Sequence, residues 1–249
     1  MAAERLRLRN VFSDLVIGAS PSLLAAPKGL ALPNRLSLDV LAALLVSLPV
    51  FVQAPLVHGH PLVATLLTVP LLSAGILLGL SPSAQRSRTG ALLVGFAGSW
   101  LCGSLFWGWC RLHPLWHLPI EALALPLALG GLRSRWQLAG GFYLASLLGT
   151  AATDAAMALT GLMPLWPAAL AAEASEAGVL LQEAALRLLN PANALLVAAF
   201  AAALLSLSLW LWQRGPTARL AAATVLTTLL VDALFVGLVV MAPRWSGLI

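Results

Sequence analysis

The residues in this sequence that are best suited to chemistry are four histidines, which occur as two closely spaced pairs. His58 and His60 form one pair, His113 and His117 form the other, and Glu121 follows one helical turn after His117. Imidazole nitrogens and a carboxylate oxygen are ligands for transition metals, and imidazole also ligates pigments. If the two pairs meet, these five residues could hold a metal, a pigment or a quinone at one face of a membrane.

The same residues also have a simpler interpretation. His-x-His and His-x-x-x-His are short patterns that arise often by chance, and histidine suits a membrane interface because its ring is amphipathic. Pro119 is suited to the first position of a helix. Glu121 would then be the third helical residue, where a carboxylate interacts favourably with free backbone amides and with the helix dipole. Both interpretations, a bound ligand and an interfacial cap, stay open.

Three aspartates lie within apolar stretches, Asp154 and Asp232 toward the middle and Asp39 nearer an edge. A carboxyl group at such a depth is costly unless it is protonated, hydrogen-bonded or turned toward a polar interior. Hydroxyl groups one turn away are available to a neutral carboxyl at Thr150, Thr153, Thr227 and Thr228. Hydrogen bonding between helices and a path for a proton or cation are the two functions that this pattern indicates.

Trp100 lies in an apolar stretch with small residues at every fourth position, Gly95, Ser99 and Gly103. Such spacing is typical of close helix contact in membranes, and a flat cofactor against the glycines is the alternative. A second ridge of this kind lies within 137–161, at Gly141, Ala145 and Gly149. We therefore expect these two stretches to pack against each other.

Composition identifies the solvent around these residues. Of the chain, 60% is hydrophobic and 9% is charged, whereas about a quarter of a soluble domain is charged. A hydrocarbon core of about 30 Å takes roughly 20 helical residues, which predicts an all-α, polytopic transmembrane bundle with about seven spans. The expected spans are 36–57, 61–80, 91–110, 114–132, 137–161, 191–212 and 220–242. The net charge of +5 is scattered between these stretches, which indicates topology signals and not nucleic-acid binding.

The basic residues also predict orientation. With seven alternating spans, most arginines fall on one side, which is predicted to be cytoplasmic together with a basic tail at 1–35. Residues 36–242 form one transmembrane domain, and 243–249 form a short outer tail. Within that domain, 162–190 has polar residues along one side of a predicted helix. We expect it either to lie flat on the outer face or to cover an outer-face site as a lid.

Three segments together resemble an uncharacterised integral-membrane family. They are FVQAPLVHGHP, GSWLCGSLFWGWCRLHPLWHLPIEALALPLAL and YLASLLGTAATD, the last followed by a Pro-Leu-Trp turn. The family is cyanobacterial and is classed as a domain of unknown function. The resemblance covers about residues 45–210, so the first tail and the seventh span lie outside it. It implies an oxygenic phototroph and a thylakoid or plasma membrane location, but no catalytic residues.

Features of several functional classes are missing from the sequence. The sequence has no nucleotide-binding loop, no nucleophile beside a base and no soluble domain. We expect a non-enzymatic accessory protein of the photosynthetic membrane, which assists complex assembly or handles a pigment, quinone or lipid. Its partners would be the lipid bilayer and other membrane-complex subunits, and its cofactor chlorophyll, a quinone or a transition metal. The alternatives are a small proton- or cation-coupled transporter and a membrane metalloenzyme built on the outer-face histidines.

Overall fold

The computed structural model describes residues 37–241, so the predicted tails at 1–35 and 243–249 lie outside the described residues. Within 37–241 the regular elements are all helical. Six of the helical runs are long and apolar enough to cross a membrane. They are Leu38–Gly59, Pro61–Gly79, Ala84–Cys110, Gln137–Leu159, Pro191–Trp212 and Pro216–Met241. The predicted all-α transmembrane bundle is confirmed, and these bounds agree with six of the seven expected spans.

Several of these runs consist of more than one element. In chain order they are α2 (Leu38–Leu48), η1 (Pro49–Gln53), α3 (Ala54–Gly59), α4 (Pro61–Leu66), α5 (Thr68–Gly79), α6 (Ala84–Leu105), η2 (Phe106–Cys110), α9 (Gln137–Leu159), α12 (Pro191–Trp212) and α13 (Pro216–Met241). Proline causes the first two interruptions, because it lacks an N–H and its ring clashes with the preceding turn. Pro49 begins the π-helical turn η1, and Pro70 follows the break at Leu67. Both runs still continue across the bundle.

The remaining expected span, 114–132, is a broken segment and not one helix. It contains η3 (Pro114–Trp116), α7 (His117–Glu121) and α8 (Leu125–Gly131). Its two ends contact α9 in reverse order, since His117 bonds Asp154 and the carbonyl of Ala128 lies against Gly140. The segment therefore runs antiparallel to α9. It returns the chain from the end of η2 to the start of α9 at the other end of the bundle, as the prediction of about seven spans requires.

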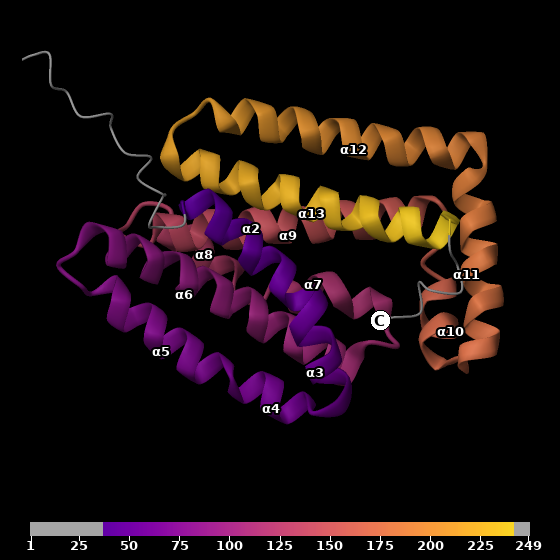
Figure 1. Cartoon of the computed structure of the whole chain (residues 1–249), viewed down its shortest axis with the longest axis horizontal. Coiled ribbons are helices and arrows are strands. Elements are labelled where there is room, and N and C mark those ends of the chain that lie inside the picture. The colour runs from indigo at the N-terminus through magenta and orange to yellow at the C-terminus, as the bar shows by residue number, and fades with distance from the viewer. Residues whose placement is uncertain (1–36, 242–249) are drawn as a thin grey trace, which may run out of the picture. The chain divides into compact units, whose positions relative to one another are not determined.

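Helices α6, α9 and α13 form the centre of the described structure. Helix α9 packs against both α6 and α13, α5 packs on α6, α12 packs on α13, and α2 lies on α13 (Figure 1). The main core cluster contains Phe96, Trp100, Phe142 and Leu220. Phe96 contacts Trp100 and Phe142 with tilted or edge-on rings, at centroid distances of 5.7 and 6.5 Å.

Two glycines on α6 allow close helix approaches. A Cβ added at Gly90 would lie 2.2 Å from the backbone nitrogen of Gly79 on α5, and one at Gly95 would lie 2.5 Å from the carbonyl oxygen of Ala139 on α9. Only a residue without a side chain fits there. The predicted packing of the third and fifth spans is confirmed at Gly95. Gly149, which we assigned to the same contact, lies instead against Thr228 of α13.

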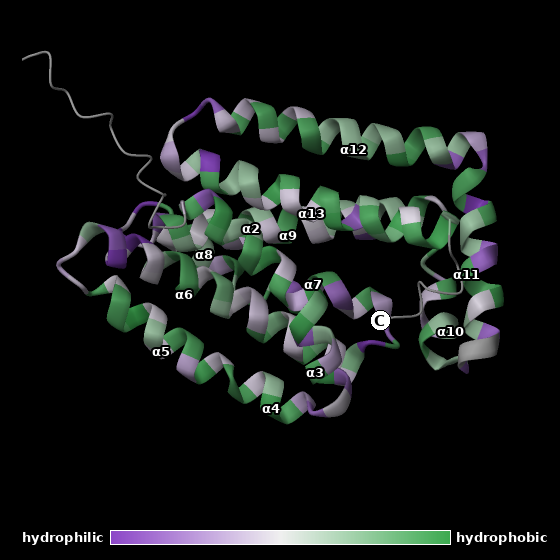
Figure 2. Ribbon diagram, in the orientation of Figure 1, coloured by the Kyte–Doolittle hydropathy of each residue, from purple (hydrophilic) through white to green (hydrophobic). Residues whose placement is uncertain are grey.

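The two ends of the described bundle differ in charge, with hydrophilic residues at the ends and apolar residues between them (Figure 2). At the first, the arginine end, the loops between spans and the first turns of α6 and α13 carry Arg86, Arg88, Arg133, Arg135, Arg214 and Arg219. Here Asp39 forms an ion pair with Arg219 at 3.5 Å, so Asp39 is an inter-helix contact. The α11 end carries α10 (Leu165–Ala171) and α11 (Ala174–Leu189). Helix α11 contacts α12 and α13 and is drawn across their ends (Figure 1).

Candidate functional site

The first feature of the site is a buried pair, His117 at the start of α7 and Asp154 on α9. Each residue is 8% exposed, and His117 Nδ1 lies 3.0 Å from both carboxylate oxygens. A proton lies between the ring and the carboxyl group, since neither group can form this hydrogen bond without one. This contact joins α7 to α9 inside the apolar bundle.

Aromatic rings enclose His117. The ring of Phe106 lies 4.3 Å away at an angle of 33°, so it partly covers the imidazole face. The rings of Trp166 and Trp107 lie at 5.4 and 6.0 Å, and they stack on each other at 5.4 Å. These rings shield the hydrogen bond between His117 and Asp154 from solvent, since both residues are 8% exposed.

Glu121 is the last residue of α7, so the prediction that it caps a helix beginning at Pro119 is wrong. It lies one turn after His117 on the same short helix. The break that follows α7 is closed by Tyr143 of α9. The Tyr143 hydroxyl donates to the backbone carbonyl of Glu121 and accepts from the N–H of Ala124 at 3.1 Å. Backbone groups freed at membrane depth need such partners.

A second carboxyl group, Asp232 on α13, is partly buried and bound to the same stretch of α9. Thr153 Oγ1 lies 2.7 Å from Asp232 Oδ2 and 3.1 Å from the carbonyl oxygen of Gly149. The hydroxyl donates to Asp232 at the shorter distance, and the longer contact with the Gly149 carbonyl shares the same proton. We expected Thr227 and Thr228 to serve Asp232, but they donate to carbonyls of their own helix. The prediction that Asp154 and Asp232 face the bundle and contact polar atoms is confirmed.

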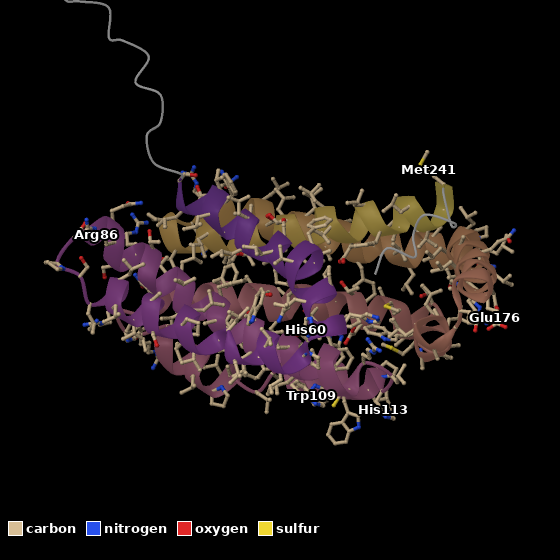
Figure 3. The ribbon with its side chains drawn as sticks, turned by 60° about the horizontal axis from the view of Figure 1, so that its bottom comes forward. His60, Arg86, Trp109, His113, Glu176 and Met241 are labelled. Carbon is tan, nitrogen blue, oxygen red and sulfur yellow. The ribbon has the colours of Figure 1, made fainter. Side chains whose placement is uncertain are left out.

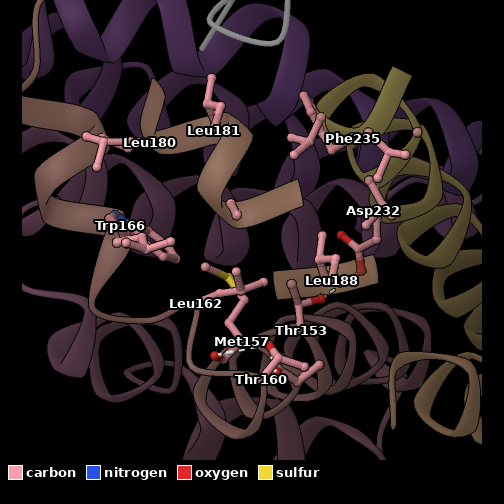
Figure 4. A pocket seen from close by; sticks show the side chains of 18 of the residues that line it. Thr153, Met157, Thr160, Leu162, Trp166, Leu180, Leu181, Leu188, Asp232 and Phe235 are labelled. Atoms are coloured by element: carbon pink, nitrogen blue, oxygen red, sulfur yellow. Dashed lines mark hydrogen bonds between the residues drawn. The ribbon is translucent and has the colours of Figure 1, made fainter. Parts of the chain in front are cut away.

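A cavity of about 1960 Å³ lies beside this polar stretch. Its walls come from α9, α10, α11, α12 and α13, together with a short part of α3. Figure 4 shows Trp166, Met157, Leu162 and Phe235 around it, with the Thr153–Asp232 hydrogen bond on its wall. The lining is mostly Ala, Val, Leu and Phe. Typical small-molecule sites have about 300–1,000 Å³, so this cavity has room for a molecule with a long hydrocarbon part.

Helix α11 supplies one wall of this cavity. Its apolar residues Val179, Leu180, Leu181 and Leu188 line the cavity, whereas Glu173, Glu176 and Glu183 are exposed. The expected Glu183–Arg187 pair forms at 2.6 Å, and Arg187 also donates to the carbonyl of Gly161. The second of these bonds connects α11 to the turn that follows α9. A helix with one charged side and one apolar side over a cavity has the form of the predicted lid.

At the margin of the cavity lies a cationic corner, which consists of Arg111 and His58. Arg111 Nη1 lies 2.7 Å from His58 Nδ1, and the Arg111 carbonyl accepts from Trp166 Nε1 at 2.9 Å. Arginine has no acceptor, so Nδ1 of a neutral His58 accepts and its other nitrogen carries the proton. Arg111, His58, Trp166 and Trp107 all line the cavity. The cavity lining is thus mostly apolar, with a few polar residues such as Thr153 and Asp232 and with hydrogen-bond donors on Arg111 and His58.

The histidines do not assemble as the metal hypothesis requires. His58 contacts Arg111, His117 contacts Asp154, and His60 and His113 are exposed (Figure 3). In the described range 37–241 no three His, Cys, Asp or Glu side chains are placed to hold a metal ion. Membrane geometry explains the difference, because His117 begins a helix that turns into the bundle while His113 stays in the connection before it.

Trp100 has a structural position. It is 3% exposed, and its ring N–H donates to the Ala64 carbonyl at 2.8 Å. The glycine face beside it is occupied by protein, since Gly95 contacts α9 and Gly103 contacts Gln53. Sequence reasoning missed Gln53, which is buried and whose amide nitrogen lies 2.6 Å from the Trp100 carbonyl and 2.7 Å from the Ser104 hydroxyl. A lone glutamine between prolines in an apolar span was the available signal.

Comparisons with known proteins identify a family but no activity. No curated protein and no solved structure matches the chain. Residues 42–240 match the family described as "Protein of unknown function (DUF3120)". The match extends beyond the 45–210 of our resemblance and includes the seventh span, α13, with Asp232. It therefore covers the His117–Asp154 pair, the cavity and the cationic corner. The chain is a member of DUF3120, a family of proteins of unknown function.

Proposed function

We propose that this protein is a non-enzymatic accessory protein of the photosynthetic membrane that binds one elongated apolar molecule, a lipid, quinone or pigment, in the cavity beneath α11. The observation that supports this function is the cavity itself, with about 1960 Å³ and a largely aliphatic lining. Apolar walls with a few convergent polar groups are typical of sites for such ligands. The thylakoid or plasma membrane of a cyanobacterium, and service to a membrane complex, are proposed from the sequence resemblance.

The cavity also suggests how a ligand would be exchanged. Helix α11 is joined to α10 by only two residues, 172–173, and its charged side is exposed. Water and lipid headgroups stabilise that side wherever α11 moves along the membrane face. The contacts that hold α11 near α9 are few and polar, and the Arg187 bond to Gly161 is one of them. Outward movement of α11 would open the cavity toward the bilayer and let an apolar molecule enter without crossing water.

The variant Gly237→Trp tests this function by filling the cavity. Gly237 lines it, and nothing lies within 4 Å of a Cβ added there, so the indole can enter without displacing backbone. We expect the purified wild-type protein to retain a lipid, quinone or pigment in mild detergent and Gly237→Trp to lose at least about nine-tenths of it, a tenfold change equal to about 1.4 kcal/mol. Mass spectrometry of the extracted molecules measures this.

Gly130→Trp is the matched control, because Gly130 also has open space around an added Cβ but is exposed and lies on α8 away from the cavity. It should retain the wild-type amount. Equal retention by the wild type and both variants would mean that the molecules bind elsewhere. Absence of any stoichiometric molecule from the wild type would remove the proposed function.

A second candidate function, a proton- or cation-coupled carrier, is favoured by one specific observation. Asp154 lies on α9 and Asp232 on α13, and Asp232 bonds Thr153, the residue next to Asp154 in α9. Buried carboxyl groups in series are the groups from which proton paths are built. Thr153 and Asp232 line the cavity, whereas Asp154 faces His117 on the other side of α9, so such a path would join the cavity to the His117–Asp154 pair.

Asp232→Asn separates the two candidates. Asparagine keeps the size of the carboxylic acid and its hydrogen bond with Thr153 but removes its titration. If the protein is a binding accessory, the variant should retain its ligand and support growth of a deletion strain in light as the wild type does. Normal abundance together with lost growth support would favour the carrier. Asp39→Asn at the arginine end is the control, since its ion pair lies far from the cavity lining.

A further inference from the structure

The cationic corner of Arg111 and His58 differs from the surroundings of the other paired arginines. Arg187 has Glu183 and Arg219 has Asp39 within ion-pair distance. Arg111 bonds a histidine instead, and no carboxylate of residues 37–241 forms an ion pair with it. Its positive charge is therefore not neutralised by the part of the chain that the structure describes, although it lies beside an apolar cavity.

The corner presents hydrogen-bond donors and no acceptor. The guanidinium group has five N–H donors in a planar fork, and the bond to His58 Nδ1 uses one of them. That bond fixes the His58 tautomer, so its Nε2–H becomes a further donor. Trp166 fixes the backbone of Arg111 through the bond to its carbonyl at 2.9 Å. A planar cationic fork beside a neutral N–H donor matches a phosphate or carboxylate oxyanion and offers nothing to a neutral ketone or a cation.

We propose that the cavity binds an anionic phospholipid of the bilayer, with its phosphodiester group on Arg111 and His58 and its acyl chains along the wall formed by α11 and α13. This inference rests on the proposed function and selects lipid from the three ligand classes named there. Charge complementarity carries it, because the lining includes the cation Arg111, while most of its other residues are apolar and Asp232 is already bonded to Thr153. A quinone or a chlorin would leave the guanidinium without a counter-ion.

The location of the corner agrees with this ligand. Arg111 directly follows η2, which ends the third transmembrane run, and His58 is the second-last residue of α3. Both therefore lie where spans end, at the depth of lipid phosphates. The nearby Trp107 and Trp166 are of the residue type enriched at that level. A lipid could then keep its headgroup at the interface and still insert its chains into the cavity.

Native mass spectrometry of the full chain in mild detergent tests the inference. The probes are phosphatidylglycerol and phosphatidylcholine with identical acyl chains, and a long-chain ubiquinone. Both lipids have a phosphodiester group, but phosphatidylcholine also carries a quaternary ammonium group that the Arg111 charge repels. We therefore expect the wild type to bind phosphatidylglycerol about tenfold more tightly than phosphatidylcholine. Arg111→Gln should remove the preference, and Arg111→Lys should keep a reduced one because it keeps the charge but not the fork. Arg86→Gln, an exposed arginine at the arginine end, should change nothing.

The outcomes distinguish the inference from the proposed function. If Gly237→Trp abolishes binding but the wild type does not prefer phosphatidylglycerol, or prefers ubiquinone, the headgroup assignment is wrong. Binding in the cavity is then still supported. A preference that survives in Arg111→Gln also overturns it. If neither the wild type nor Gly237→Trp binds any of the probes, both the headgroup assignment and the proposed function are wrong. Thermal unfolding of Arg111→Gln and Arg111→Lys is measured in parallel, and if Arg111→Gln is unfolded, the comparison rests on Arg111→Lys and the wild type.

Discussion

Replacing Asp154 by alanine is expected to lower the free energy of unfolding by about 3–5 kcal/mol, the usual cost of removing one partner of a buried pair. His117 would remain 8% exposed among Phe106, Trp107 and Trp166 with no carboxyl group on its Nδ1. Asp154→Asn should be milder, since the amide oxygen still accepts from Nδ1–H. Thermal unfolding in detergent, with the wild type as reference, measures both variants.

Asp39→Ala is the matched control for Asp154→Ala. Asp39 forms an ion pair with Arg219 at 3.5 Å, but the side chains are 25% and 49% exposed. Exposed pairs contribute about 0–1 kcal/mol, so the control should unfold nearly as the wild type does. If Asp154→Ala were no more destabilised than Asp39→Ala, the buried pair would not hold α7 to α9, and the site would lose its central contact.

The second large effect is expected at Gly90, where α6 meets α5. A Cβ there would lie 2.2 Å from the nitrogen of Gly79 and 2.6 Å from the carbonyl oxygen of Gly75, both of which are backbone atoms. Since backbone cannot rotate aside, Gly90→Leu must push α5 away from α6 along its length. We expect a loss at or above the upper end of the about 1–3 kcal/mol that overpacking usually costs. The yield of folded protein and its thermal unfolding measure this.

Gly130→Leu controls for the helix propensity and hydrophobicity that the substitution adds. Nothing lies within 4 Å of a Cβ at Gly130, so the same change of residue meets no neighbour. It should be neutral or slightly stabilising, because leucine is a better helix former than glycine. Similar stability of the two variants would show that α5 and α6 do not approach each other as closely as described.

The spans were predictable because hydropathy and length alone decide whether a segment crosses a bilayer. The stretch expected at 191–212 is α12 to the residue, and 137–161 differs from α9 only at its end. Helices α6 and α13 begin before the predicted 91 and 220, at Ala84 and Pro216. Their first turns carry polar residues that lower the hydropathy of the sequence window but are tolerated at an interface.

The candidate site was only half predictable. His117, Asp154 and Asp232 were identified one by one, since ionisable residues in apolar stretches stand out. The residues they bond depend on which faces of non-neighbouring helices pack together, and no local sequence pattern indicates that. Thus Asp154 bonds His117 and not the nearby threonines, and Thr153 serves Asp232 from another helix. The cavity was not predictable at all, because it is a property of how α11 sits over α9, α12 and α13.

The most direct test of the account is a cryo-EM structure of the protein in nanodiscs of its native membrane lipids, bound to a rigid antibody fragment. The claim under test is that the cavity beneath α11 holds an elongated apolar molecule. We predict continuous density between Trp166 and Asp232, along α13, that no protein residue accounts for and that ends at Arg111. A structure in which α11 packs directly on α9 and α13, so that side chains fill the space, would contradict the claim.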